Sequence, residues 1–185
     1  MLGIIRRNFV DLDKNSFLLL YKGLVRSHLE FTGPVWNPYK KGLIKEIESI
    51  QKKATTLLRF CKGMSYKERL MVLLLPTLKY RRFRGDMIEV YKILNNLYDV
   101  QTVPLLSLHQ DSRTRGNSFK LKVNRCNYDV RKYSFCNRVV NSWNSLPNSV
   151  VLSGSMNIFK HNMDEYFLRE SCCYYDYEVD PFDFS

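Results

Sequence analysis

Apolar residues recur at helical spacing near the start of the chain. Between Asp13 and Gly33, the positions of Phe17, Tyr21 and Leu24 predict a helix. Asp13 suits the N-cap of this helix because its carboxylate can accept hydrogen bonds from the first free amides. A proline follows Gly33, so we expect the helix to end before this pair.

The strongest helical pattern comes next along the chain. Six apolar positions are spaced 4, 3, 4, 3 and 4 residues apart, namely Leu43, Ile47, Ile50, Ala54, Leu57 and Cys61. This spacing predicts one buried stripe on a helix whose other faces carry Lys45, Lys52, Lys53 and Arg59. Asn37–Pro38 is the expected start, because proline fits a first helical turn. We therefore expect a helix that packs on one side and presents cations on the other.

Two further helices are predicted from their caps. Ser65 and Glu68 have the spacing of a capping box, and the helix that they open is expected to end by Pro76. Thr77 is a candidate cap for the next helix. The apolar face of that helix comprises Tyr80, Phe83, Met87, Tyr91, Leu94 and Tyr98. Residues 1–98 are thus expected to form a helical bundle.

A connection and a second, smaller unit are predicted beyond this bundle. Residues 99–116 contain proline, glycine and scattered polar residues, which are typical of a connection. In residues 117–170, the alternation of apolar and polar positions from Phe119 to Val123 predicts one short strand or hairpin with a basic face. Helical spacing predicts two helices, one over residues 131–145 and one that begins at Ser155. The expected fold is mainly α, with a small α+β unit after the bundle.

Charge is distributed unevenly along the 185 residues. The chain has 29 Lys and Arg against 18 Asp and Glu, a net charge of +11 and a calculated pI near 9.5. Residues 171–185 hold four acidic residues and no Lys or Arg, so the rest of the chain has 29 cations against 14 acids, or +15. We expect this acidic, aromatic tail to be disordered. The basic body favours a polyanion as partner.

Several locations and site types are disfavoured by the sequence. The longest apolar runs are far shorter than the roughly 20 residues that span a bilayer, and Arg6 and Arg7 interrupt the first ten residues where a secretory signal needs an apolar stretch. Five cysteines lack metal-ligand spacing, so we interpret them as reduced thiols. These features predict no membrane partner and an intracellular location, either nuclear or cytoplasmic.

Catalytic motifs are not found in the sequence. It contains no phosphate loop, GxGxxG, GxSxG or HExxH motif. The close acidic pair Asp11 and Asp13 is accounted for by helix capping, and the three histidines have no obvious common partner. We therefore expect no catalytic residues, no metal ligands and no cofactor, and a chain that is not an enzyme by itself.

The informative side chains are cationic. The segment from Lys79 to Arg84 places four cations in six residues at a helix start, where they oppose the helix dipole and so suggest an external anion. The flexible segment from Arg113 to Lys122 adds four more that suit phosphate contacts. Solvated surface charge is the alternative for each cluster. The candidate nucleic-acid-binding residues are Lys52, Lys53, Arg59, Lys79, Arg81, Arg82, Arg84, Arg113, Arg115, Lys120 and Lys122. Trp36 and Trp143 are candidates for base stacking, with burial in the core as the favoured alternative.

Six strings of the sequence together resemble one family. They are LGIIRRNF (2–9), LLLYKGLVRSHLEFTGPVWNPY (18–39), IQKKATTLL (50–58), LPTLKYRRFRGDMIEVYKIL (75–94), TRGNSFKL (114–121) and NRVVNSWNSLPNSVV (137–151). In order and spacing they resemble the C-terminal part of the reverse transcriptase of LINE-class, non-LTR retrotransposons of the jockey and chicken-repeat type. The resemblance covers about residues 2 to 168, and the tail departs from it.

The resemblance implies the position of this chain within a larger polymerase. Its first part is similar to the helical thumb that grips a template–primer duplex. The palm carboxylates and the magnesium ions that they bind in the full-length family have no counterpart in these strings, so a palm-containing chain is a possible partner. Met1 matches an internal position of the family, which predicts the remnant of a 5′-truncated element.

Two functional hypotheses follow. The first is a fragment of an RNA-directed DNA polymerase that lacks the palm and binds RNA, DNA or their hybrid through basic helical faces, independently of base sequence. The second is a non-enzymatic interaction module or a non-functional remnant, whose apolar stripes would promote self-association.

Overall fold

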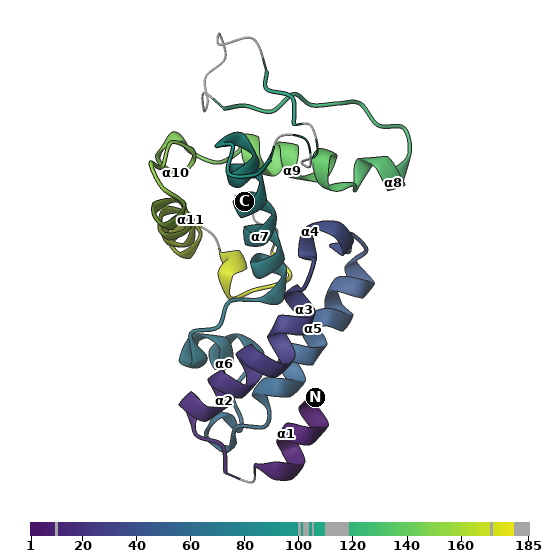
Figure 1. Ribbon diagram of the computed structural model, residues 1–185. Helices are drawn as coiled ribbons and strands as arrows, with labels where there is room; N and C mark the ends of the chain where they lie inside the picture. Colours follow the sequence, from purple (N-terminus) through teal and green to yellow (C-terminus); the bar gives the residue numbers. More distant parts are fainter. Residues whose placement is uncertain are drawn as a thin grey trace. The chain divides into compact units, whose positions relative to one another are not determined.

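The computed structural model describes residues 1–9, 11–99, 101, 104, 106–109, 119–170 and 172–179. The fold is mainly α-helical, as predicted (Figure 1). The chain divides into two compact units: unit 1 combines Met1–Arg82 with Cys172–Asp180, and unit 2 combines Phe83–Ser171 with Pro181–Ser185. The division falls within a helix, after Arg82, whereas the sequence placed the end of the bundle at residue 98.

Unit 1 is built from short helices around one long helix. In chain order they are α1 (Leu2–Asn8), α2 (Lys14–Leu20), a π-helical segment (Tyr21–Arg26), α3 (Ser27–Glu30), α4 (Gly33–Trp36), α5 (Lys41–Thr55), a 3₁₀ turn (Arg59–Cys61), α6 (Tyr66–Leu73), the start of α7 (Leu78–Leu94) and a second 3₁₀ turn (Cys172–Tyr174). The cap predictions are confirmed: Asp13 accepts bonds from Asn15 N and Ser16 N, and Ser65 and Glu68 form a capping box. Thr77 Oγ1 accepts a bond from Tyr80 N, as expected of a cap on α7.

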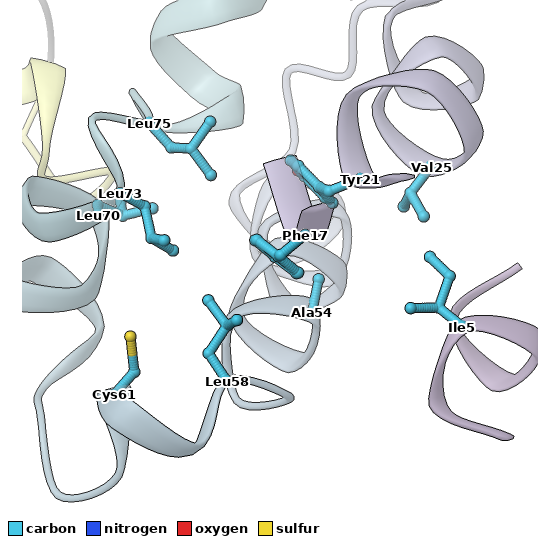
Figure 2. Packing of buried hydrophobic residues seen from close by; sticks show 10 residues of the cluster. All are labelled: Ile5, Phe17, Tyr21, Val25, Ala54, Leu58, Cys61, Leu70, Leu73 and Leu75. Atoms are coloured by element: carbon cyan, nitrogen blue, oxygen red, sulfur yellow. The ribbon is translucent and has the colours of Figure 1, made fainter. Parts of the chain in front are cut away.

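The core of unit 1 gathers apolar side chains from most of these elements (Figure 2). Phe17 and Tyr21 stack with their ring centroids 5.6 Å apart. The remaining members of the cluster are Ile5, Val25, Ala54, Leu58, Cys61, Leu70, Leu73 and Leu75. Burying this set removes large apolar side chains from water, each worth about 1.5–3 kcal/mol.

Helix α5 differs from its prediction in extent and in its buried face. It begins at Lys41, so the expected start at Asn37–Pro38 is wrong. It ends at Thr55, where the hydroxyls of Thr55 and Thr56 bond back to carbonyls of the last turn and compete with further helical bonds. Leu43, expected in the buried stripe, is 45% exposed. The side chains that are buried on α5 are Glu48, Gln51, Ala54 and Thr55.

Among its described residues, unit 2 comprises the rest of α7 followed by four helices. These are α8 (Asp129–Lys132), α9 (Phe135–Asn144), α10 (Asn148–Val151) and α11 (Met156–Glu170). Tyr91 of α7 stacks on Phe159 of α11 with centroids 4.4 Å apart, and Trp143 of α9 is fully buried beside them. Ser155 accepts a bond from Ile158 N, as expected of the cap of the last helix.

The predicted basic strand is reduced to an isolated antiparallel bridge between Leu108 and Leu121, and no sheet forms among the described residues. Two bonds of 2.8 Å flank the bridge, from His109 N to Lys120 O and from Lys122 N to Ser107 O. The carboxamide of Asn144 completes the pairing of Leu121, because it both accepts from Leu121 N and donates to Leu121 O. A side chain therefore supplies what a neighbouring strand would supply in a sheet.

The acidic tail is ordered over residues 172–179, so the expectation of a disordered tail is wrong for this segment. Thr77 N donates to Tyr174 O over 2.9 Å, and the rings of Tyr80 and Tyr174 lie 4.8 Å apart. Cys173 is buried. The aromatic content of the tail explains its order, because its tyrosines bury apolar area against the start of α7.

Candidate nucleic-acid interface

The arginines at the start of α7 are held by carboxylates within their own units. Arg81 forms a bidentate pair with Glu30 through Nε and Nη2, each 2.7 Å from a carboxylate oxygen. Arg84 pairs in the same way with Asp164, at 2.6 Å for both bonds. Such fork-to-fork pairs are directional and charge-assisted. These two predicted site residues are thus engaged in internal ion pairs.

Lys79 and Arg82 complete the cluster and are also directed into unit 1. The Lys79 ammonium donates to Val179 O of the tail over 3.0 Å. Arg82 is only 5% exposed. The four cations are therefore engaged within the fold, Arg81 and Arg84 in ion pairs, Lys79 on a carbonyl oxygen and Arg82 by burial.

A buried carboxylate takes the place of the external anion that the sequence suggested. Glu48 of α5 is 2% exposed, and its two oxygens accept bonds from Leu78 N (3.2 Å) and Lys79 N (3.3 Å) in the first turn of α7. Tyr66 Oη donates to the same carboxylate over 2.5 Å. Burial raises the pKa of Glu48, while the bond from Tyr66 and the charge of Arg82 act in the opposite direction. The expectation of an external anion at this helix start is corrected accordingly.

The buried polar contacts continue along α5. Tyr21 Oη donates to Gln51 Oε1, and Gln51 Nε2 donates to Pro76 O over 2.9 Å. One turn further on, Thr55 Oγ1 accepts a bond from Arg69 Nε over 3.1 Å. This network fixes α5 against its neighbours through one side of the helix.

Exposed lysines lie along the edge of this buried side, since Lys45 and Lys52 are three and four residues from Glu48. Lys52 and Lys53, both predicted site residues, are exposed, as are Lys41 and Lys45. Because Lys41, Lys45 and Lys52 are four and seven residues apart, they lie on one side of the helix over about 16 Å of its length. We call Lys41, Lys45 and Lys52 the α5 lysine row. Among the described residues, none of the three has a carboxylate within ion-pair distance.

The remaining predicted site residues are distributed over both units. Arg59 pairs with Asp11 at 2.7 Å, but both side chains are largely exposed, so the pair adds little stability. Lys120 is half-buried and Lys122 exposed beside the β-bridge of unit 2. Arg113 and Arg115 lie outside the described residues. The two tryptophans differ, since Trp143 belongs to the core of unit 2 while Trp36 is 39% exposed in unit 1.

The sequence did not predict that Glu30 and Asp164 pair with Arg81 and Arg84. It also did not identify Lys41 and Lys45 as binding residues. A signal for the buried polar side of α5 is present in the sequence, because Glu48, Gln51 and Thr55 are three and four residues apart. The partners of Arg81 and Arg84 have no local signal, since they lie 51 and 80 residues away.

Two other features are absent from the described part of the chain. Within it, no three His, Cys, Asp or Glu side chains gather in a way that could hold a metal ion. No helix in the same ranges is long and apolar enough to cross a membrane. No protein-family model, curated protein or solved structure matches the chain.

Proposed function

We propose that this chain is a thumb-like part of a retrotransposon reverse transcriptase and that it binds nucleic-acid backbones without reading their base sequence. The α5 lysine row is the observation that carries the proposal. The three lysines lie along the exposed edge of a helix whose buried side chains are fixed by hydrogen bonds, so their backbone positions are set. Arrays of this kind contact phosphates and release counterions, which favours binding to any nucleic acid.

The charge of unit 1 supports the same site. Unit 1 contains 17 Lys and Arg against nine Asp and Glu, whereas unit 2 contains 12 against nine. The net charge is therefore +8 for unit 1, which carries the row, and +3 for unit 2. RNA–DNA hybrids are A-like, so recognition would depend on backbone shape.

In this proposal the chain has no polymerase activity of its own. The resemblance places it after the palm, and the palm carboxylates have no counterpart in the matching strings. Primer extension on an RNA template with Mg²⁺ is expected to give no product, while a complex with a palm-containing chain is the arrangement in which the row would act.

Salt titration tests the proposed function. Affinity for a duplex or hybrid should fall with added salt, with a log–log slope of about 0.9 per phosphate contact on B-DNA. The variant Lys45→Ala/Lys52→Ala should lower that slope by about 1.8. The control Arg131→Ala/Lys132→Ala removes two exposed cations from α8 of unit 2 and should change the slope much less. Equal effects of the two variants, or no binding at low salt, would refute the proposal.

A second candidate function, an interaction module without nucleic-acid binding, is favoured by exposed apolar side chains in unit 1. Leu19 of α2 and Val35 of α4 are the clearest cases, at 76% and 83% exposed. If another protein normally covers them, the isolated chain should self-associate. Size-exclusion chromatography separates the two: a monomer that binds nucleic acid supports the first proposal, and a soluble aggregate without binding supports the second.

A further inference from the structure

Aromatic rings and lysines are concentrated in one short stretch just before and at the start of α5. Phe31 is 72% exposed and Trp36 is 39% exposed, and Lys40 and Lys41 follow within five residues of Trp36. Residues 31–45 contain three lysines and no acidic residue. The stretch is therefore both aromatic and cationic at its surface. We call residues 31–36 the aromatic turn.

The aromatic turn is held in shape by its own backbone. Thr32 has φ of 49°, a left-handed conformation that is unusual for a β-branched residue and is found where surrounding structure imposes it. The single turn of α4 follows directly, and the indole Nε1 of Trp36 donates to Phe31 O across it. The indole is thereby fixed relative to the residue that carries the Phe31 ring. A preformed aromatic surface loses less conformational entropy when a ligand binds.

The exposed aromatic rings and lysines of residues 31–41 favour an unpaired nucleic-acid strand as ligand. Exposed aromatic rings stack on nucleobases, and neighbouring lysines contact the phosphates. Bases in a duplex are already stacked on each other, so only an unpaired strand offers free base faces. An anionic membrane is a poorer match, because interfacial binding usually relies on an extended amphipathic helix, whereas α4 has four residues.

We propose that the aromatic turn binds an unpaired nucleic-acid strand by stacking bases on Phe31 and Trp36. The inference rests on the proposed function, because the strand would continue from the turn onto the α5 lysine row. Lys41, the first residue of α5 and of the row, follows Trp36 of the turn by five residues. Unit 1 would then contact a duplex through phosphates alone and a single strand through phosphates and bases.

Fluorescence gives a direct test, because the chain has two tryptophans in different environments. Trp143 is 1% exposed and donates its indole N–H to Phe119 O, so an oligonucleotide should leave its emission unchanged. Adding an oligothymidylate of about 12 nucleotides should quench Trp36. The variant Trp36→Phe retains only Trp143 and should show no quenching. Quenching of equal size in wild type and Trp36→Phe would overturn the inference.

Affinities separate this inference from the function on which it rests. Phe31→Ala/Trp36→Ala should weaken binding to the oligothymidylate about tenfold or more and leave duplex binding unchanged. Both side chains are partly or largely exposed, and Leu19→Ala in the same unit serves as the control for a lost exposed apolar group. Unchanged affinity of the double variant for the single strand, with intact duplex binding, would overturn the inference alone. Loss of all binding by the wild type would overturn the proposed function as well. Binding of the wild type to anionic phosphatidylserine vesicles in preference to the oligothymidylate would point to a membrane and also overturn the inference.

Discussion

Individual charged residues in this protein have roles that their sequence context did not reveal. Arg81 and Glu48 are the clearest examples, because Arg81 was a candidate phosphate ligand and the sequence indicated no role for Glu48. Arg81 is bound by Glu30 in a two-bond pair, and Glu48 accepts the first amides of α7. Both residues therefore make bonds within the folded chain, and we expect their substitution to change the free energy of unfolding.

Removing Arg81 should destabilise unit 1. Arg81→Ala leaves the half-buried Glu30 carboxylate with only the 3.5 Å contact from Arg26, so we expect the free energy of unfolding to fall by about 1–2 kcal/mol. Arg81→Lys should recover only part of this loss, because an ammonium cannot form the planar pair. Urea denaturation measures the change, with Lys53→Ala as an exposed control. An unchanged midpoint for Arg81→Ala would show that its pair with Glu30 does not stabilise unit 1, and the interpretation of Arg81 as a phosphate ligand would then stand.

Glu48 should give the protein a specific dependence on pH. Burial raises its pKa in the folded state, so the folded chain binds this proton more tightly than the unfolded chain does. Its contribution to stability is greatest at low pH and is lost as the pH rises from the ordinary glutamate value, about 4.3, through the raised value. Glu48→Gln keeps a carbonyl acceptor for the α7 amides and cannot ionise. Across this window, the stability of wild type relative to Glu48→Gln should fall as the pH rises, and parallel curves would contradict the assignment.

At the scale of elements, helix starts with a side-chain cap were predictable, whereas the uncapped start of α5 and the partners of the helices were not. The caps Asp13, Ser65 and Thr77 act within three residues along the chain, so local sequence specifies them. The end of α5 depends on side-chain bonds of a threonine pair, and its buried face depends on the start of α7. The spacing of Glu48, Gln51 and Thr55 marks a polar face on α5, but it does not name the partner that buries this face. Among the candidate interface residues, Lys52 and Lys53 are exposed, whereas Arg81 and Arg84 are held in ion pairs.

The ordered tail is the element with a direct bearing on binding. A cavity of about 200 Å³ is lined by Lys41, Ile44, Lys45, Tyr177 and Glu178, so the tail places a carboxylate beside the first two members of the α5 lysine row. Asp176 lies 4.0 Å from the Lys67 ammonium. The two acids therefore lower the positive potential that a nucleic acid would meet on this face.

Neutralising these two acids should tighten binding. Asp176→Asn/Glu178→Gln preserves the shape of both side chains, and we expect about threefold higher affinity for a duplex at low salt, with the difference shrinking as salt is added. Asp129→Asn/Glu165→Gln makes the same change of charge in unit 2 and serves as the control. Similar gains from both variants would show that net charge alone is responsible.

At the scale of the whole molecule, the chain forms two units of unequal charge, and the described part of unit 1 is discontinuous in sequence. Unit 1 includes residues 172–179, which are separated from Arg82 by the whole described part of unit 2. The sequence predicted that the chain before residue 171 is more basic than the whole, because net charge follows directly from the residue composition. It did not predict the discontinuity, since the tail has no helical periodicity that would mark it as part of a core.

Deleting residues 172–185 should destabilise unit 1. The deletion removes buried Cys173, the ring of Tyr174 against Tyr80 and the bond from Thr77 N to Tyr174 O. We expect a loss of about 2 kcal/mol or more, measured as a lower midpoint of thermal unfolding. A truncated chain as stable as the full chain would show that these contacts contribute nothing in solution.

The discontinuity of unit 1 also sets an order of events during synthesis. A ribosome completes residues 1–82 long before residues 172–179, and domains generally fold as they emerge. Thr77 and Tyr80 therefore lack their contacts with Tyr174 while unit 2 is being translated. The first half of the protein reaches its finished state only with nearly the last residues to be made, so a nascent chain halted within unit 2 should remain sensitive to proteases throughout the start of α7.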